Sequence, residues 1–219
     1  MLSKQLKWIL LFMALAMACF NTYAQNQWVL NTNKDGIKVY TREVEGSKFK
    51  EYRGEVLVTT KLSALIAVLD DVDNQKNWFH DCIESRKLKN ISRTEGINYF
   101  QQYAPWPVSN RDIIVKYSIS QNLKTKVITI ELTGLKNYIP EKEDIVRVPK
   151  LKGFWQFTPQ GNGNIKIVYQ AHSETGGSVP AYLANAASVD IPYYTLKNML
   201  IEIKKPKYKN AVIEGVIEP

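Results

Sequence analysis

The residue types that most often carry catalysis are scarce in this chain. The two histidines, His80 and His172, lie on different segments, and no histidine motif accompanies Cys82. Of the two cysteines, Cys19 lies in an N-terminal segment that we expect to be removed, and the one remaining thiol and two distant imidazoles cannot make a zinc site from nitrogen and sulfur ligands alone. The chain also lacks a Gly-x-Ser-x-Gly turn, a phosphate-binding loop and a dinucleotide-binding glycine pattern. The sequence therefore predicts a protein that is not an enzyme, with no catalytic residue, no metal site and no cofactor.

Arg111 is the charged residue of greatest chemical interest. Its planar guanidinium could bind an anionic group of a ligand through two parallel hydrogen bonds. It could instead bind a neighbouring carboxylate, or the carbonyls of an adjacent loop. We favour the structural role, because Arg111 and Asp112 belong to opposite faces of one predicted strand, but we keep Arg111 among the candidate binding residues.

These residues must be positioned by strands, because alternating apolar and polar segments recur at short, regular spacing. Glycine, asparagine or proline bounds most of the segments, and no long helical crossover separates them, which is typical of an antiparallel meander. The first two should form a hairpin. The predicted strands are 37–41, 49–58, 82–89, 97–103, 112–120, 126–132, 151–158 and 165–172.

Two helices interrupt this strand pattern. The first follows a predicted cap at Thr59-Thr60 and repeats apolar residues with helical spacing over 62–69. The second should run from about Val179 to Lys204. Within it, the small residues Ala186 and Ala187 should leave space above the sheet, whereas apolar residues from Leu196 onward should pack against the sheet.

Alternation assigns faces to the strands. Asp112 and Lys116 should face water, whereas Ile113 and Tyr117 should face the second helix. By the same rule Ile130, Trp155 and Tyr169 point inward on other strands. Aromatic rings with a polar tip can line a cavity or pack in an ordinary core, and periodicity alone does not separate these two arrangements.

Several segments, taken in order along the chain, resemble the START (steroidogenic acute regulatory protein-related lipid transfer) domain family, in a bacterial-type secreted form. The more specific ones are Trp106-Pro107-Val108-Ser109-Asn110-Arg111-Asp112 and the helix start Gly176-Gly177-Ser178-Val179-Pro180. Weaker matches include 35–42, 49–54 and 153–157. The resemblance implies an α+β helix-grip fold, in which a curved antiparallel β-sheet is closed by a long C-terminal α-helix around a hydrophobic cavity.

The resemblance also implies a ligand, namely a lipid or another hydrophobic small molecule, that the protein binds and could transfer without chemistry. Some sterol-carrying members hold an acidic residue and an arginine as a pair inside the cavity, and an ungapped match places Asn98 and Tyr117 there instead. This departure argues against a charged pair and against sterol specificity. The candidate ligand-binding residues are Trp78, Tyr99, Arg111, Ile113, Tyr117, Ile130, Trp155, Tyr169, Leu183 and Ala187.

Two other functions stay open at this point. The wider helix-grip superfamily includes cyclase and aromatase enzymes that use the same cup, and a domain of this kind with a filled core could serve as an extracytoplasmic interaction protein. Occupancy of the cavity by a ligand distinguishes the carrier from the interaction protein.

The N-terminus has the order of a secretory signal peptide: two lysines, an apolar run from Trp8 to Phe20, and Thr22-Tyr23-Ala24. We expect residues 1–24 to be removed and residues 25–219 to form a single domain that is secreted or periplasmic. The alternative is a lipoprotein anchored through Cys19.

The chain is basic, with a formal net charge of +8, and loss of the signal would remove Lys4 and Lys7. The remaining cations are mostly scattered, except for a cluster over 204–209. Such a cluster is usually solvated, and its sharper interpretation is a transient contact with a membrane surface. Secretion argues against a nucleic-acid partner.

Overall fold

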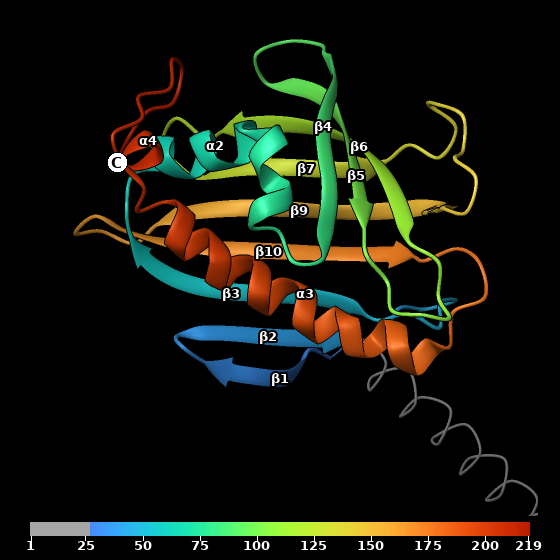
Figure 1. Ribbon diagram of the computed structural model, residues 1–219. Helices are drawn as coiled ribbons and strands as arrows, with labels where there is room; N and C mark the ends of the chain where they lie inside the picture. Colours follow the sequence, from blue (N-terminus) through green and yellow to red (C-terminus); the bar gives the residue numbers. More distant parts are fainter. Residues whose placement is uncertain (1–26) are drawn as a thin grey trace, which may run out of the picture.

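The computed structural model describes residues 27–219, so the predicted signal peptide at 1–24 lies outside the described residues. One ten-stranded sheet dominates it, with strand order β1-β2-β3-β10-β9-β7-β6-β5-β4 and with β8 paired to β6 (Figure 1). The strands are β1 (Val29–Lys34), β2 (Ile37–Arg42), β3 (Glu51–Thr59), β4 (Cys82–Asn90), β5 (Glu95–Gln102), β6 (Arg111–Gln121), β7 (Ile128–Gly134), β8 (Val146–Arg147), β9 (Lys150–Pro159) and β10 (Asn164–Glu174).

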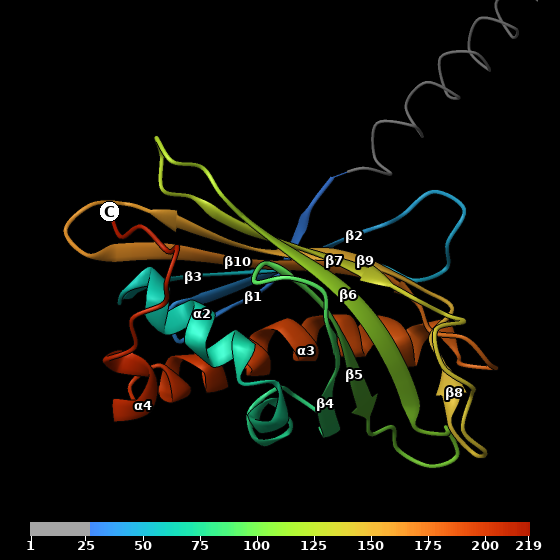
Figure 2. The same ribbon diagram turned by 90° about the horizontal axis from the view of Figure 1, so that it is seen from above.

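The sheet is mostly antiparallel, as predicted. Every pairing is antiparallel except that of β6 with β8, which is parallel. The sheet is strongly curved and its two ends, β1 and β4, do not pair, so it is not a closed barrel (Figure 2). The predicted hairpin is β2–β3, and β1 adds a strand to it that the sequence pattern did not predict.

The long helix α3 (Ala181–Glu202) crosses the sheet and packs on β2 and β3, which confirms the predicted C-terminal helix (Figure 1). Gly54 of β3 permits this close approach. A Cβ atom at Gly54 would lie 2.7 Å from Cδ1 of Leu196 and 3.0 Å from Cβ of Pro192. A larger residue at this position would therefore require the Leu196 side chain to move and would crowd Pro192 of α3.

The other helices are α2 (Leu62–Asp70), the 3-10 helix η1 (Val72–Asn77) and the short α4 (Pro206–Lys209), on the same side of the sheet as α3 (Figure 2). The predicted cap at Thr59-Thr60 is wrong, because the first turn of α2 is capped by Glu218 from the end of the chain. Its carboxylate accepts hydrogen bonds from the backbone N–H groups of Leu62 and Ser63, both at 2.8 Å. The C-terminal segment thus binds α2 beside the sheet.

The main core lies between the sheet and the helices, and it includes Ile37, Leu65, Phe157, Ile167 and Leu196. A smaller core lies on the opposite face of β5 and β6, under the segment from Leu135 to Ile139. This second core corrects the prediction that Asp112 faces water. Asp112 is fully buried, because the segment that leads into β8 covers it.

No helix among residues 27–219 combines the length and the apolar character that crossing a membrane requires.

Candidate ligand-binding cavity

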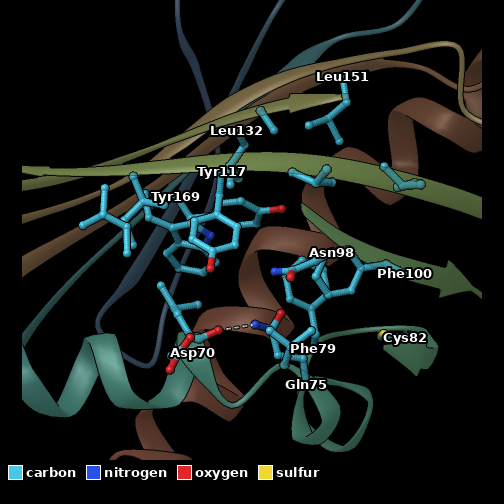
Figure 3. A pocket seen from close by; sticks show the side chains of 18 of the residues that line it. Asp70, Gln75, Phe79, Cys82, Asn98, Phe100, Tyr117, Leu132, Leu151 and Tyr169 are labelled. Atoms are coloured by element: carbon cyan, nitrogen blue, oxygen red, sulfur yellow. Dashed lines mark hydrogen bonds between the residues drawn. The ribbon is translucent and has the colours of Figure 1, made fainter. Parts of the chain in front are cut away.

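A cavity of about 180 Å³ lies between the sheet, α2, η1 and the middle of α3 (Figure 3). The strands contribute apolar side chains at alternate positions, since only one face of each strand points toward the helices. Ile113, Val115 and Ile119 come from β6, and Ile130 and Leu132 come from β7. Ile191 of α3 and Ile213 of the C-terminal segment complete this apolar lining.

Small residues keep the centre of the cavity open. Tyr117 and Leu132 are register partners across β6 and β7, and the row continues through Gly153 of β9 to Ala171 of β10. On the other side of this row, Tyr117 faces Gly96 of β5. A Cβ atom at Gly96 would lie only 2.6 Å from the hydroxyl oxygen of Tyr117, so the tyrosine side chain lies over the glycine.

A pair of tyrosines provides buried hydroxyl groups at the cavity wall. The hydroxyl of Tyr52 donates to that of Tyr169 at 2.7 Å, and the ring of Trp155 stacks on Tyr169 with centroids 4.0 Å apart. Burial raises the pKa of Tyr169 to about 12 and holds the pKa of Tyr52 well above its ordinary range. Both phenols are therefore neutral at physiological pH.

Asn98 presents its amide group to the cavity. The residue is 7% exposed, and its Oδ1 atom accepts no hydrogen bond from any described residue. Figure 3 shows the amide beside Phe100, directed toward the space under β6. Most buried polar side-chain atoms are hydrogen-bonded, and this oxygen is one of three such atoms in residues 27–219 that are not.

Cys82 also lines the cavity, and its thiol is inert. The sulfur lies 3.3 Å from the carbonyl oxygen of Glu84, to which the thiol donates. Burial raises the pKa of Cys82 to about 11, and a nucleophilic cysteine needs its thiolate form near neutral pH. The geometry thus favours a wall residue over a nucleophile.

The charged residues that line the cavity have ion-pair partners. Asp70 accepts a hydrogen bond from Nζ of Lys87 at 2.9 Å, and Arg93 pairs with Glu214 at 2.7 Å. Both pairs are substantially exposed, which places these residues at the rim. Within residues 27–219, no group of three or more histidine, cysteine, aspartate or glutamate side chains could hold a metal ion.

The structure brings five of the ten candidate binding residues to the cavity wall. They come from four neighbouring strands, β6, β7, β9 and β10. These residues are Ile113, Tyr117, Ile130, Trp155 and Tyr169. Their contact with a ligand stays a prediction.

Three other candidates are buried away from the cavity. Trp78 packs in the main core. Tyr99 lies on the opposite face of β5, between the cations of Arg86 and Lys142, because neighbouring positions of a strand point to opposite faces. Arg111 donates to the carbonyl oxygen of Ser109, and its structural role stays a prediction.

The prediction of space beneath the start of α3 is wrong. Leu183 is 37% exposed and Ala187 is half-buried, and neither lines the cavity. The first turns of α3 instead bind the β2–β3 connection, where Oδ1 of Asn185 accepts the backbone N–H of Lys50 at 2.9 Å. The cavity lies farther along the helix, at Ile191, and is bounded by α2 and η1.

Sequence reasoning missed several wall residues, including Phe79, Phe100, Leu132 and Ala171. Alternation in β5 contained a usable signal, because Asn98, Phe100 and Gln102 share the cavity face. Phe79 carried no such signal, since it lies in an irregular segment after η1.

Comparisons with known proteins place this architecture in a family. The START domain family profile matches residues 18–192. An uncharacterised protein of Pseudomonas aeruginosa is 37% identical over 195 residues, which cover 87% of this chain and 95% of that protein. The mouse phosphatidylcholine transfer protein is 24% identical, over 79% of this chain and 82% of that protein.

A solved structure shares the fold closely. The crystal structure of a fragment of the STAR-related lipid transfer protein from Xanthomonas axonopodis superposes with a TM-score of 0.76 at 35% identity. The matched region covers 81% of this chain and 99% of the Xanthomonas chain. With a family profile that matches most of its length and two bacterial relatives above 30% identity, this chain belongs to the START domain family.

Proposed function

We propose that this protein binds a lipid or other hydrophobic small molecule in its cavity and performs no chemistry on it. The observation that carries the proposal is the apolar cavity between the sheet and the helices, with neutral phenols, a neutral amide and an unreactive thiol in its wall. The lipid transfer named for the Xanthomonas and mouse relatives supports the same function.

Burial alone supplies sufficient affinity. Each methylene group removed from water contributes about 0.8 kcal/mol, so a chain of roughly ten methylenes contributes on the order of 8 kcal/mol before the costs of association. Without those costs a total of this size would correspond to a dissociation constant near 1 μM, and the costs weaken the binding from that value. Shape and apolar area can thus hold the ligand without a catalytic group.

Native mass spectrometry of gently purified protein tests this proposal. The expected spectrum contains a bound species whose added mass is released by organic solvent and identified as a lipid. Incubation with mixed lipid vesicles should restore the added mass to delipidated protein. A protein that stays free of any added mass in both experiments would contradict the proposal and favour an interaction domain.

We also propose that residues 1–24 are a signal peptide and that the mature protein acts outside the cytoplasm. The support is the cationic start, the short apolar run and the small residue at Ala24. Intact mass measurement of protein from its natural host should give a chain that begins at Gln25. A chain that retains Met1, or one that begins at a lipidated Cys19, would overturn this cleavage site.

Exchange of a membrane lipid requires transient contact with a membrane surface, and we include this contact in the proposal. The basic segment 204–209 is less available than its sequence indicates, because Lys205 pairs with Glu202 and Lys207 with Asp71. Lys204 and Lys209 are exposed. Flotation with anionic and neutral vesicles tests the contact. Protein that floats with neither kind of vesicle would contradict it.

A further inference from the structure

We propose that the ligand is an uncharged amphiphile with a single hydrocarbon chain, whose hydroxyl or amide group binds Asn98. This inference rests on the proposed lipid-binding function and names the chemical class of the ligand. It follows from the unpaired amide inside the cavity, from the absence of an unpaired charge in the wall, and from the size of the cavity.

The amide of Asn98 is the first argument. An asparagine side chain offers an acceptor oxygen and two donor hydrogens. Oδ1 of Asn98 is buried without a partner, and no described residue bonds its amide nitrogen. An unsatisfied buried polar group costs roughly 1–3 kcal/mol. A ligand group that both donates and accepts, such as a hydroxyl or an amide, would satisfy the side chain and recover this free energy.

Tyr117 extends the polar site. Its hydroxyl lies over Gly96, which precedes Asn98 by two positions on the same face of β5. Positions two apart on a strand are separated by about 7 Å, so one small head group can contact both side chains. No hydrogen bond to another side chain among residues 27–219 perturbs the hydroxyl of Tyr117, and burial raises its pKa. Tyr117 is therefore a neutral second partner.

Among the described residues, the charges that line the wall are already paired, so they are not free counter-charges for an ionic head group. Asp70 and Arg93, at the rim, are paired with Lys87 and Glu214 respectively. Arg111 does not line the cavity. An ion that enters an apolar environment without a partner has a large desolvation cost. A phosphocholine or carboxylate group beside Asn98 would therefore bind less tightly than an uncharged group, since Lys87, the cation near Tyr117, is already paired with Asp70.

The cavity volume limits the hydrocarbon part. About 180 Å³ is below the roughly 300–1,000 Å³ of ordinary small-molecule pockets. Any long acyl chain must displace the walls of a cavity this small, and because protein interiors resist such expansion, two chains cost more than one. One chain with a small head group needs far less displacement.

Four probes with the same oleoyl chain test the proposal: 1-oleoylglycerol, N-oleoylethanolamine, oleate and 1-oleoyl lysophosphatidylcholine. Their affinities can be followed by tryptophan fluorescence, because Trp155 lines the cavity. We expect the two uncharged probes to bind at least tenfold more tightly than the two charged ones at pH 7.4. Oleate or lysophosphatidylcholine as the tightest ligand would overturn the inference.

Two variants test whether Asn98 causes the preference for uncharged probes. Asn98→Leu keeps the approximate volume and removes both hydrogen-bonding groups, so it should reduce the preference for uncharged probes to below about threefold. Its melting temperature without ligand should be equal to or higher than that of the wild type, since an unsatisfied polar group is lost. Val115→Leu, at the register partner of Asn98, changes the wall without removing a polar group and should shift all four affinities alike. A lower melting temperature for Asn98→Leu with its selectivity unchanged would assign Asn98 a structural role and overturn the inference.

The same experiment separates this inference from the proposed function. If the four probes fail to bind while native mass spectrometry detects a phospholipid, lipid binding stands and the class named here is wrong. If no lipid of any kind binds, both proposals fall.

Discussion

Arg147 and Asp112 form a buried, two-point ion pair on the outer face of the sheet. Nε and Nη2 of Arg147 donate to the two carboxylate oxygens of Asp112 at 2.7 and 3.0 Å, and each side chain is 1% exposed. Nη1 also donates to the carbonyl oxygens of Lys136 and Ile139. The guanidinium of Arg147 therefore joins β8, β6 and the segment that contains Lys136 and Ile139. Its hydrogen bonds to Asp112 raise the pKa of Arg147.

Breaking this pair should destabilise the protein strongly. Arg147→Ala leaves the Asp112 carboxylate buried and unpaired, which should lower the free energy of unfolding by about 3–5 kcal/mol. Urea unfolding measures the change. The exposed pair Lys197–Asp35 is the matched control, since Lys197→Ala should cost at most about 1 kcal/mol. Equal losses for the two variants would show that Arg147 does not fix the segment.

Arg111→Ala should affect folding more than ligand binding. Arg111 is 9% exposed, donates to the carbonyl oxygen of Ser109 and has no ion-pair partner among the described residues. Loss of this bond and of the side-chain packing should cost roughly 1–3 kcal/mol. Arg111→Met, which keeps the packing and removes the buried charge, should cost less. Full thermal stability of Arg111→Ala combined with loss of lipid binding would contradict the structural role.

The sequence pattern predicted the strands whose faces differ in polarity. Ile113 and Tyr117 alternate with the polar Asp112 and Lys116, and this alternation correctly identified the cavity face of β6. The same alternation wrongly placed Asp112 in water, because the smaller core and the segment that leads into β8 cover the opposite face of β6. Edge strand β1 was missed since it is mostly exposed and polar, so its pattern resembles a loop.

The position of the cavity along α3 could not be predicted. Small residues indicated space at Ala187, but a helix residue borders a cavity only where the helix lies over the sheet. That placement depends on long-range contacts, such as the approach of Leu196 to Gly54, and on the partner of Asn185 in the β2–β3 connection. Neither contact is local in sequence.

The buried tyrosine pair predicts a specific alkaline behaviour. The pKa of Tyr169 is raised from 10.0 to about 12 in the folded state, so the unfolded chain loses this proton first. The contribution to stability is therefore complete below pH 10 and is lost as the pH rises toward 12. In urea unfolding at pH 8–11, the double variant Tyr52→Phe/Tyr169→Phe should lose less stability with pH than the wild type.

Two further variants control this experiment. Tyr52→Phe alone leaves one buried hydroxyl without its partner and should cost about 1–3 kcal/mol at pH 7, more than the double variant. Tyr138→Phe, at an exposed tyrosine, should leave the pH dependence unchanged. Parallel pH profiles for the wild type and the double variant would contradict the assignment.

Filling the cavity should displace the ligand, and the position of the substitution matters. Leu132 lines the cavity beside Tyr117 (Figure 3), so Leu132→Trp should place the indole in the empty space and abolish lipid binding in native mass spectrometry. Because the added ring enters a void of about 180 Å³, the stability loss should stay below the roughly 1–3 kcal/mol of overpacking in a filled core. Ala187→Trp adds a large side chain outside the cavity and should retain the ligand. If Ala187→Trp loses the lipid and Leu132→Trp keeps it, the ligand binds near the start of α3 and not in the cavity beside Leu132.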